Sequence, residues 1–120
     1  MLIVDDNADS REMYSECLAL AGMHVATAED GDVGVLKAIE WNPDVVVMDF
    51  SMPKVAGDQA TRTLKKDPRT KNIAVLILTA HGEQAREAVK AAGADAFCAK
   101  PCGPQELVEV IKRLAAQPSV

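Results

Sequence analysis

Short hydrophobic runs alternate along this chain with segments in which apolar residues recur at helical spacing. Runs rich in aliphatic and β-branched residues predict strands at residues 1–4, 24–28, 44–49, 73–78 and 94–99. The amphipathic segments between them predict helices at residues 8–21, 33–41, 57–66, 82–92 and 104–116. This alternation predicts an α/β fold in which a five-stranded parallel sheet carries five helices on its two faces.

Residues with special backbone preferences mark the ends of these elements. Asn7 suits the cap of the first helix, and Gly22 and Gly93 suit helix ends. Pro104 suits the first position of the last helix. The apolar stripe of the first helix is expected to consist of Met13, Tyr14, Cys17, Leu18 and Ala21. No linker, repeat or low-complexity tract interrupts the pattern, so we expect one domain over residues 1–120.

The run at residues 44–49 is an uninterrupted apolar stretch that ends in a carboxylate. Val45-Val46-Val47-Met48 shows no polar alternation, which is typical of a strand buried on both faces. Asp49 follows at the carboxyl end, where open parallel sheets place their ligand sites. Its carboxylate is therefore either a cap of the following turn or a reacting group.

Composition argues against several classes of partner. A net charge of −5 and a pI near 4.9 disfavour a nucleic-acid or anionic-membrane surface on this domain. No apolar run approaches the roughly 18 residues that span a bilayer, and no basic-then-apolar leader opens the chain. The three cysteines are an odd number in a chain that shows no secretion signal, which favours free thiols in a reducing cytoplasm. A metal site on Cys98 and Cys102 would need two more nearby ligands.

Polar residues gather where the predicted strands end. Asp5-Asp6 follows the first strand, Asp49 ends the third, Thr79 closes the fourth and Lys100 follows the fifth. Because the carboxyl ends of parallel strands share one edge, these side chains are expected to meet in one pocket. Three carboxylates together repel unless a cation joins them, and oxygen ligands suit a hard divalent ion such as Mg²⁺.

Each of these residues also has a plainer interpretation. An aspartate pair after a strand often caps the next helix, a threonine at a strand end is usually a turn residue, and a single lysine is usually solvated. All of them at one edge of the sheet favour a joint site over five separate coincidences.

The motifs in which these residues occur are similar to those of a known family. They are Asp5-Asp6, Met48-Asp49, Met52-Pro53, Gly57, Leu78-Thr79-Ala80, Gly93-Ala94-Asp95 and Lys100-Pro101. With this combination the chain resembles, over essentially its whole length, the receiver domain of bacterial two-component response regulators. The resemblance implies a flavodoxin-like, doubly wound sheet with strand order 2-1-3-4-5.

The resemblance also implies the chemistry of the acidic edge. Asp49 would accept a phosphoryl group from the phosphohistidine of a sensor histidine kinase or a histidine phosphotransfer protein. Asp6, Asp49 and the backbone carbonyl of Ser51 would bind Mg²⁺, with Asp5 acting chiefly through water. Lys100 and the hydroxyl of Thr79 would each bind a phosphoryl oxygen. Such a domain catalyses only its own phosphorylation and dephosphorylation, so no enzyme acting on other substrates is expected.

The output implied by the resemblance is a two-state switch. Movement of Thr79 would be coupled to rotation of Phe97, which would change the face formed by the fourth helix, the fifth strand and the fifth helix. Phe97 can equally be a plain core aromatic, and it lacks the hydroxyl of the commoner tyrosine. Ala96 replaces an aspartate that helps one subfamily to dimerise, so we expect a monomer or a weak dimer with an unidentified downstream effector.

Three other interpretations stay open on the sequence. The expected first strand has only four residues before Asp5, so the segment can also be a relay domain excised from a larger regulator or hybrid kinase. A haloacid-dehalogenase-type phosphatase uses a strand-end aspartate, Mg²⁺ and a lysine, but it needs a second aspartate as general acid where Ser51 stands. A flavin mononucleotide carrier would bind phosphate after the first strand, where Asp5, Asp6 and Asp9 would repel it.

Overall fold

The strands and helices of the chain follow one another in strict alternation. The computed structural model describes residues 1–50, 57–79, 83–99 and 103–116. Within these ranges the strands are β1 (Leu2–Val4), β2 (Ala26–Ala28), β3 (Val45–Asp49), β4 (Ala74–Thr79) and β5 (Ala96–Ala99). The helices are α1 (Ala8–Leu20), α2 (Gly31–Trp41), α3 (Gly57–Lys66), α4 (Glu83–Ala91) and α5 (Pro104–Ala116).

All strand pairs are parallel, and the sheet order is β2-β1-β3-β4-β5. The predicted α/β class and the strand order implied by the resemblance are both confirmed. In the register, Leu2 pairs with Ala26 on one side and with Val46 on the other. The short β1 therefore lies between β2 and β3, and it brings the residues that follow it close to the end of β3.

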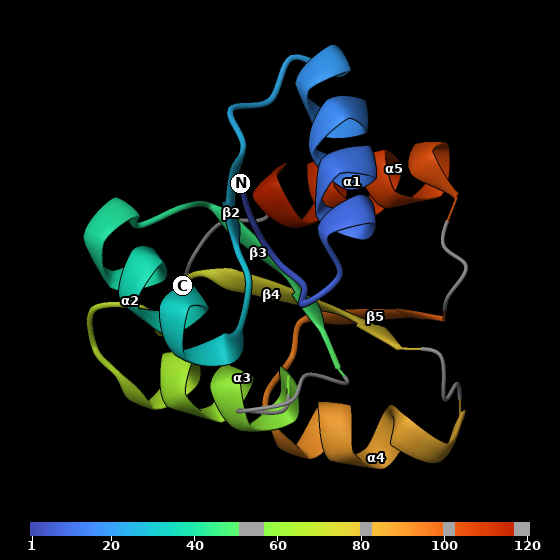
Figure 1. Ribbon diagram of the computed structural model, residues 1–120. Helices are drawn as coiled ribbons and strands as arrows, with labels where there is room; N and C mark the ends of the chain where they lie inside the picture. The colour runs from blue at the N-terminus through green and yellow to red at the C-terminus, as the bar shows by residue number, and fades with distance from the viewer. Residues whose placement is uncertain (51–56, 80–82, 100–102, 117–120) are drawn as a thin grey trace.

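Helices cover both faces of the sheet, as Figure 1 shows: α1 and α5 lie on one face, and α2, α3 and α4 on the other. Alternate residues of each strand belong to different cores. Val45 and Val47 pack with Leu18 and Leu107 on the first face, whereas Val46 packs in the cluster on the second face. Every residue of β3 is buried, which explains its uninterrupted apolar run.

The helix ends follow the expected capping chemistry with one correction. The side chain of Asn7 caps α1 and accepts a hydrogen bond from the backbone N–H of Ser10 at 3.0 Å. The second helix begins at Gly31 instead of Val33, because the side chain of Asp30 caps it and accepts from the N–H of Val33 at 2.9 Å. Asp30 and Gly31, which precede the predicted start, thus contribute the cap and the first residue of α2.

The predicted apolar stripe of α1 is only partly correct. Tyr14 and Leu18 are buried against the sheet, but Met13 is 45% exposed and Ala21 lies beyond the last helical residue in an exposed position. At about 100° per residue, Met13 lies well around the helix from the face that Tyr14 and Leu18 share, so its side chain reaches solvent. None of the helices in the described ranges is long and apolar enough to cross a membrane.

At the amino edge of the sheet, a lysine from α3 ties β4 to the segment before β5. The Nζ of Lys65 donates to Asp95 Oδ2 at 2.7 Å and to the carbonyl oxygen of Ile73 at 2.8 Å. The same oxygen of Asp95 accepts from the N–H of Val75 at 2.8 Å. Gly93, at φ 93°, supplies the left-handed turn predicted for the end of α4. At this edge the ion pair of Lys65 and Asp95 thus links α3 to the beginnings of β4 and β5.

Candidate metal centre at the carboxyl edge of the sheet

Three carboxylates meet at the opposite, carboxyl edge. One ligand oxygen each from Asp5, Asp6 and Asp49 lies within 4.8 Å of the other two. Asp5 and Asp6 follow β1, and Asp49 is the last residue of the neighbouring β3. The convergence predicted from strand ends is therefore present for these three residues. Three oxygen donors at this spacing fit a hard divalent cation, which would offset their mutual repulsion.

Asp5 is only 2% exposed and is held by hydrogen bonds to backbone groups. Its Oδ1 accepts from the N–H of Asn7 at 2.9 Å, and its own N–H donates to the carbonyl oxygen of Ala28 at 3.1 Å. Asp6, by contrast, is exposed. A buried, fixed carboxylate thus lies beside a solvent-facing one, so the site is both preorganised and open to an incoming ion.

An arginine that the sequence did not single out also contacts this edge. The Nη1 of Arg11 donates to the backbone carbonyl oxygen of Asp5 at 2.7 Å. Arg11 stands four residues after Asn7 in the sequence, and its N–H donates to the Asn7 carbonyl oxygen at 3.0 Å. That backbone bond is the ordinary one of a helix, so nothing in the sequence pattern indicated where the Arg11 side chain would lie.

The backbone around Asp49 leaves space for glycine alone at the start of α3. Asp49 is 6% exposed, and the N–H of Gly57 donates to the carbonyl oxygen of Phe50 at 2.8 Å. A Cβ atom at Gly57 would overlap the carbonyl oxygen of Asp49. The first turn of α3 is therefore pressed against the backbone that carries the Asp49 carboxylate.

Thr79 completes the described part of the edge. It ends β4, is 1% exposed and pairs with Ala99, while its neighbour Leu78 pairs with Asp49. The hydroxyl predicted to share the edge with the carboxylates is thus on the adjoining strand. Lys100 and Ser51, which were expected to complete the pocket, lie outside the described residues.

Phe97 lies on β5 and is half-buried against the core beneath α2, α3 and α4. The guanidinium carbon of Arg86, from α4, lies 6.0 Å from the centroid of the Phe97 ring. This distance is at the outer limit of a cation–π interaction. The ring is therefore neither a fully enclosed core residue nor a free surface residue.

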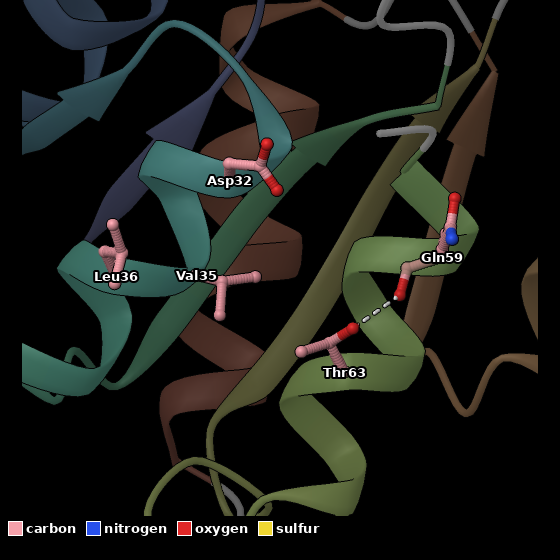
Figure 2. Close-up of a pocket in the computed structure, with 5 residues that line it drawn as sticks. All are labelled: Asp32, Val35, Leu36, Gln59 and Thr63. Atoms are coloured by element: carbon pink, nitrogen blue, oxygen red, sulfur yellow. Dashed lines mark hydrogen bonds between the residues drawn. The ribbon is translucent and has the colours of Figure 1, made fainter. Parts of the chain in front are cut away.

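A separate cleft of about 440 Å³ opens between α2 and α3. Figure 2 shows its lining residues, which are Asp32, Val35, Leu36, Gln59 and Thr63. The hydroxyl of Thr63 donates to the carbonyl oxygen of Gln59 at 3.1 Å within α3. None of the three clustered carboxylates lines this cleft, so it is separate from the acidic edge.

Comparison with known proteins identifies the family. The model of the response regulator receiver domain matches residues 1–112. The chain belongs to this family. Receiver domains are phosphorylation-dependent signalling switches of two-component systems, they bind Mg²⁺ at an acidic pocket, and histidine kinases phosphorylate them.

Individual relatives include both short and long proteins. The chain is 39% identical over 119 residues to the chemotaxis protein CheY of Thermotoga maritima, covering 96% of each chain. It is 35% identical over 113 residues to the phosphate regulon transcriptional regulatory protein PhoB of Pseudomonas aeruginosa, covering 93% of this chain. The chain spans only 49% of the length of that PhoB.

A solved structure supports the interpretation of the acidic edge. The receiver domain of sensor histidine kinase PA1611 from Pseudomonas aeruginosa superposes with a TM-score of 0.91 at 28% identity. The match covers 97% of this chain and 96% of that one. That structure holds a magnesium ion coordinated in its active-site cleft.

Proposed function

We propose that this chain acts as the phosphoacceptor switch of a two-component pathway and that Asp49 is the residue phosphorylated. The observation that carries the proposal is the convergence of Asp5, Asp6 and Asp49 within 4.8 Å at the carboxyl edge of the sheet. Asp49 ends a strand buried on both faces, which fixes its position relative to the two other carboxylates. Rigid placement is the main requirement of phosphoryl transfer.

The reaction is an in-line displacement at phosphorus. A carboxylate oxygen of Asp49 attacks the phosphoryl group of a phosphohistidine, an O–P bond forms, and the P–N bond breaks. The electron pair of the broken bond returns to the imidazole nitrogen of the donor. The product is an acyl phosphate on Asp49, whose negative charge requires compensation in the pocket.

The chain's own residues divide this task. Asp5, Asp6, Asp49 and the carbonyl of Ser51 are the proposed Mg²⁺ ligands, and the bound ion neutralises charge on the phosphoryl oxygens. Lys100 supplies a compact positive charge, and the buried hydroxyl of Thr79 donates to a phosphoryl oxygen. The oxygen-rich donor set and the low exposure of Asp5, Asp49 and Thr79 support these assignments.

We propose that the signal leaves the site through Thr79 and Phe97. Thr79 and Phe97 lie on the paired strands β4 and β5, so a shift of the hydroxyl toward a phosphoryl group acts next to the ring. Phosphorylation changes the structure only if it stabilises the conformation with one orientation of the Phe97 ring more than the conformation with the other. Arg86, at 6.0 Å from the ring centroid, belongs to the surface that such a rotation would alter.

The wider context follows from the same proposal. We infer a single receiver domain over residues 1–120 that works in the cytoplasm as a monomer or weak dimer and acts on no substrate but its own phosphoryl group. Its donor is a sensor histidine kinase or a histidine phosphotransfer protein, and its target is a downstream effector. The alternative is a relay domain within a hybrid kinase, with the same chemistry at Asp49.

Substitution of Asp49 tests the assignment. The protein is incubated with Mg²⁺ and acetyl phosphate, and the mass of the adduct is measured together with its stability in acid and base. We expect one phosphoryl group per chain, stable in acid and labile in base, which disappears in Asp49→Asn. The matched control is Asp44→Asn, which changes an exposed carboxylate just before the same strand and should label fully.

Two results would contradict the proposal. Full labelling of Asp49→Asn would mean that another residue is the acceptor. Continuous release of inorganic phosphate from a small phosphomonoester, without a stoichiometric adduct, would instead favour a phosphatase.

A further inference from the structure

The carbonyl oxygen of Asp5 lies where the ladders of β1 end. The last residue pairs of β1 are Val4 with Ala28 and Val4 with Met48. Just beyond them, the half-buried side chain of Arg11 reaches back from α1 and donates to the Asp5 carbonyl at 2.7 Å. The Asp5 carbonyl oxygen therefore accepts its hydrogen bond from the Arg11 side chain at the point where the strand pairing ends.

This hydrogen bond acts on the peptide unit that joins two of the clustered carboxylates. The carbonyl group of Asp5 and the N–H and Cα of Asp6 lie in one plane, because the peptide bond does not rotate freely. Fixing the carbonyl oxygen therefore fixes the direction in which the chain leaves toward Asp6. The side chain of Asp5 is held as well, because its Oδ1 accepts a hydrogen bond from the backbone N–H of Asn7 at 2.9 Å.

We propose that Arg11 is a positioning residue that sets the selectivity of the acidic edge for Mg²⁺ over Ca²⁺. The inference rests on the proposed function, in which Asp5 and Asp6 contribute to a divalent-ion site. Mg²⁺ demands near-octahedral ligands at about 2.0–2.1 Å, whereas Ca²⁺ accepts irregular sets at about 2.3–2.6 Å. A loosened Asp5–Asp6 peptide therefore weakens the site for Mg²⁺ more than for Ca²⁺.

The ratio of the two affinities separates geometry from charge. The guanidinium of Arg11 is itself positive, so its removal favours any cation at the edge and opposes the effect of lost positioning. Both ions carry the same charge, so this electrostatic gain is shared and cancels in the ratio of their dissociation constants. A change in the ratio then reports the ligand geometry.

A purely structural role for Arg11 predicts a different result. If the hydrogen bond only satisfies the Asp5 carbonyl and anchors α1, its loss lowers the free energy of unfolding and leaves the ion ratio unchanged. Unfolding by urea, followed for each variant without metal, measures this part separately.

The test uses Arg11→Met, which keeps length and helix propensity but removes the donors and the charge. Arg11→Lys retains a charge and a donor, and Arg62→Met is the control. Arg62 is exposed on α3 and has no partner among the residues that the structure describes. Calorimetric titration gives the dissociation constants of Mg²⁺ and Ca²⁺ for each protein.

We expect the Mg²⁺ preference, the Ca²⁺ constant divided by the Mg²⁺ constant, to fall by up to about tenfold in Arg11→Met, the low end of the effect of a lost outer-shell partner, because Arg11 acts through the backbone. Arg11→Lys should restore part of the preference, and Arg62→Met should match the wild type. An unchanged ratio in Arg11→Met, with Mg²⁺ bound normally by the wild type, overturns this inference alone. A wild-type protein that binds no Mg²⁺ overturns the proposed function as well.

Discussion

The two edges of the sheet treat carboxylates in opposite ways. At the amino edge, Asp95 accepts from the Lys65 ammonium at 2.7 Å and from a backbone N–H, and Asp67 accepts from the Arg69 guanidinium at 2.7 Å. At the carboxyl edge, three carboxylates are brought within 4.8 Å of one another. Among the described residues, the amino edge pairs opposite charges, whereas the carboxyl edge gathers three carboxylates beside the guanidinium of Arg11.

This difference separates the parts of the molecule that stabilise the fold from those that give it a function. Charge pairs at the amino edge lower the free energy of the folded chain directly. We expect repulsion among the three clustered carboxylates to raise it, and a bound cation to offset that repulsion. A substitution should therefore change stability in opposite directions at the two edges.

The largest expected effect is stabilisation by the ion itself. At a Mg²⁺ concentration about a hundred times its dissociation constant, the free energy of unfolding should rise by about 2.7 kcal/mol, because only the folded state assembles the site. Urea unfolding with Mg²⁺ and with a chelator measures the increment. Asp95→Ala should keep the increment, whereas Asp6→Asn should lose about half of it or more. An equal increment in both would erase the contrast between the edges.

Next in size is the loss of the amino-edge network. Asp95→Ala removes the acceptor shared by the Lys65 ammonium and the Val75 N–H, so the metal-free free energy of unfolding should fall by about 2 kcal/mol. Mg²⁺ affinity should stay as in the wild type. Glu109→Ala, at an exposed position of α5, is the control and should change neither quantity. Weakened Mg²⁺ binding in Asp95→Ala would show that the two edges are coupled.

A smaller effect of opposite sign is expected at the acidic edge. Asp6→Asn keeps the shape of an exposed side chain and removes one of three like charges, so without metal the free energy of unfolding should rise by about 1 kcal/mol. The same variant should bind Mg²⁺ at least about tenfold more weakly by calorimetry. A metal-free variant less stable than the wild type would argue against repulsion in the cluster.

The smallest effect concerns the exposed pair of Asp67 and Arg69. The hydrogen bond from the Arg69 side chain lowers the pKa of Asp67 from 3.8 to about 2. Because the pKa is lower in the folded state, the unfolded state binds more protons. The stabilisation is complete above pH 3.8 and is lost as the pH falls toward 2.

Two variants check this pH dependence. Arg69→Met should return the pKa of Asp67 toward its usual value, measured by a carboxyl NMR titration. The difference in Tm between the wild type and Asp67→Asn should shrink on acidification through the same range. A constant difference across that range would mean that the charge of Asp67 does not contribute to stability.

The sequence was sufficient for features that depend on local pattern. Periodicity predicts the alternation of strands and helices, and residue preferences predict the Asn7 cap and the turn at Gly93. The meeting of Asp5, Asp6 and Asp49 follows from the rule that parallel strand ends share an edge. The strand order came from family resemblance, because periodicity alone does not fix which strands are neighbours.

Features that depend on the direction of a long side chain could not be predicted. Lys65 meets Asp95 across 30 residues of sequence, and Arg11 reaches the Asp5 carbonyl by folding back past its own helix cap. A lysine or arginine on a helix is usually solvated, and its sequence pattern does not distinguish the exceptions. The early start of α2 was missed because Asp30-Gly31 also fits a turn.

The register between β1 and β3 is what brings two of the clustered carboxylates together. Leu2, Ile3 and Val4 pair with Val46, Val47 and Met48, and the next residues in the same frame are Asp5 and Asp49. A slip of one residue would turn the side chains of one strand to the opposite face and separate the two carboxylates. A divalent ion bound by both carboxylates would therefore stabilise the observed strand alignment over one displaced by a residue.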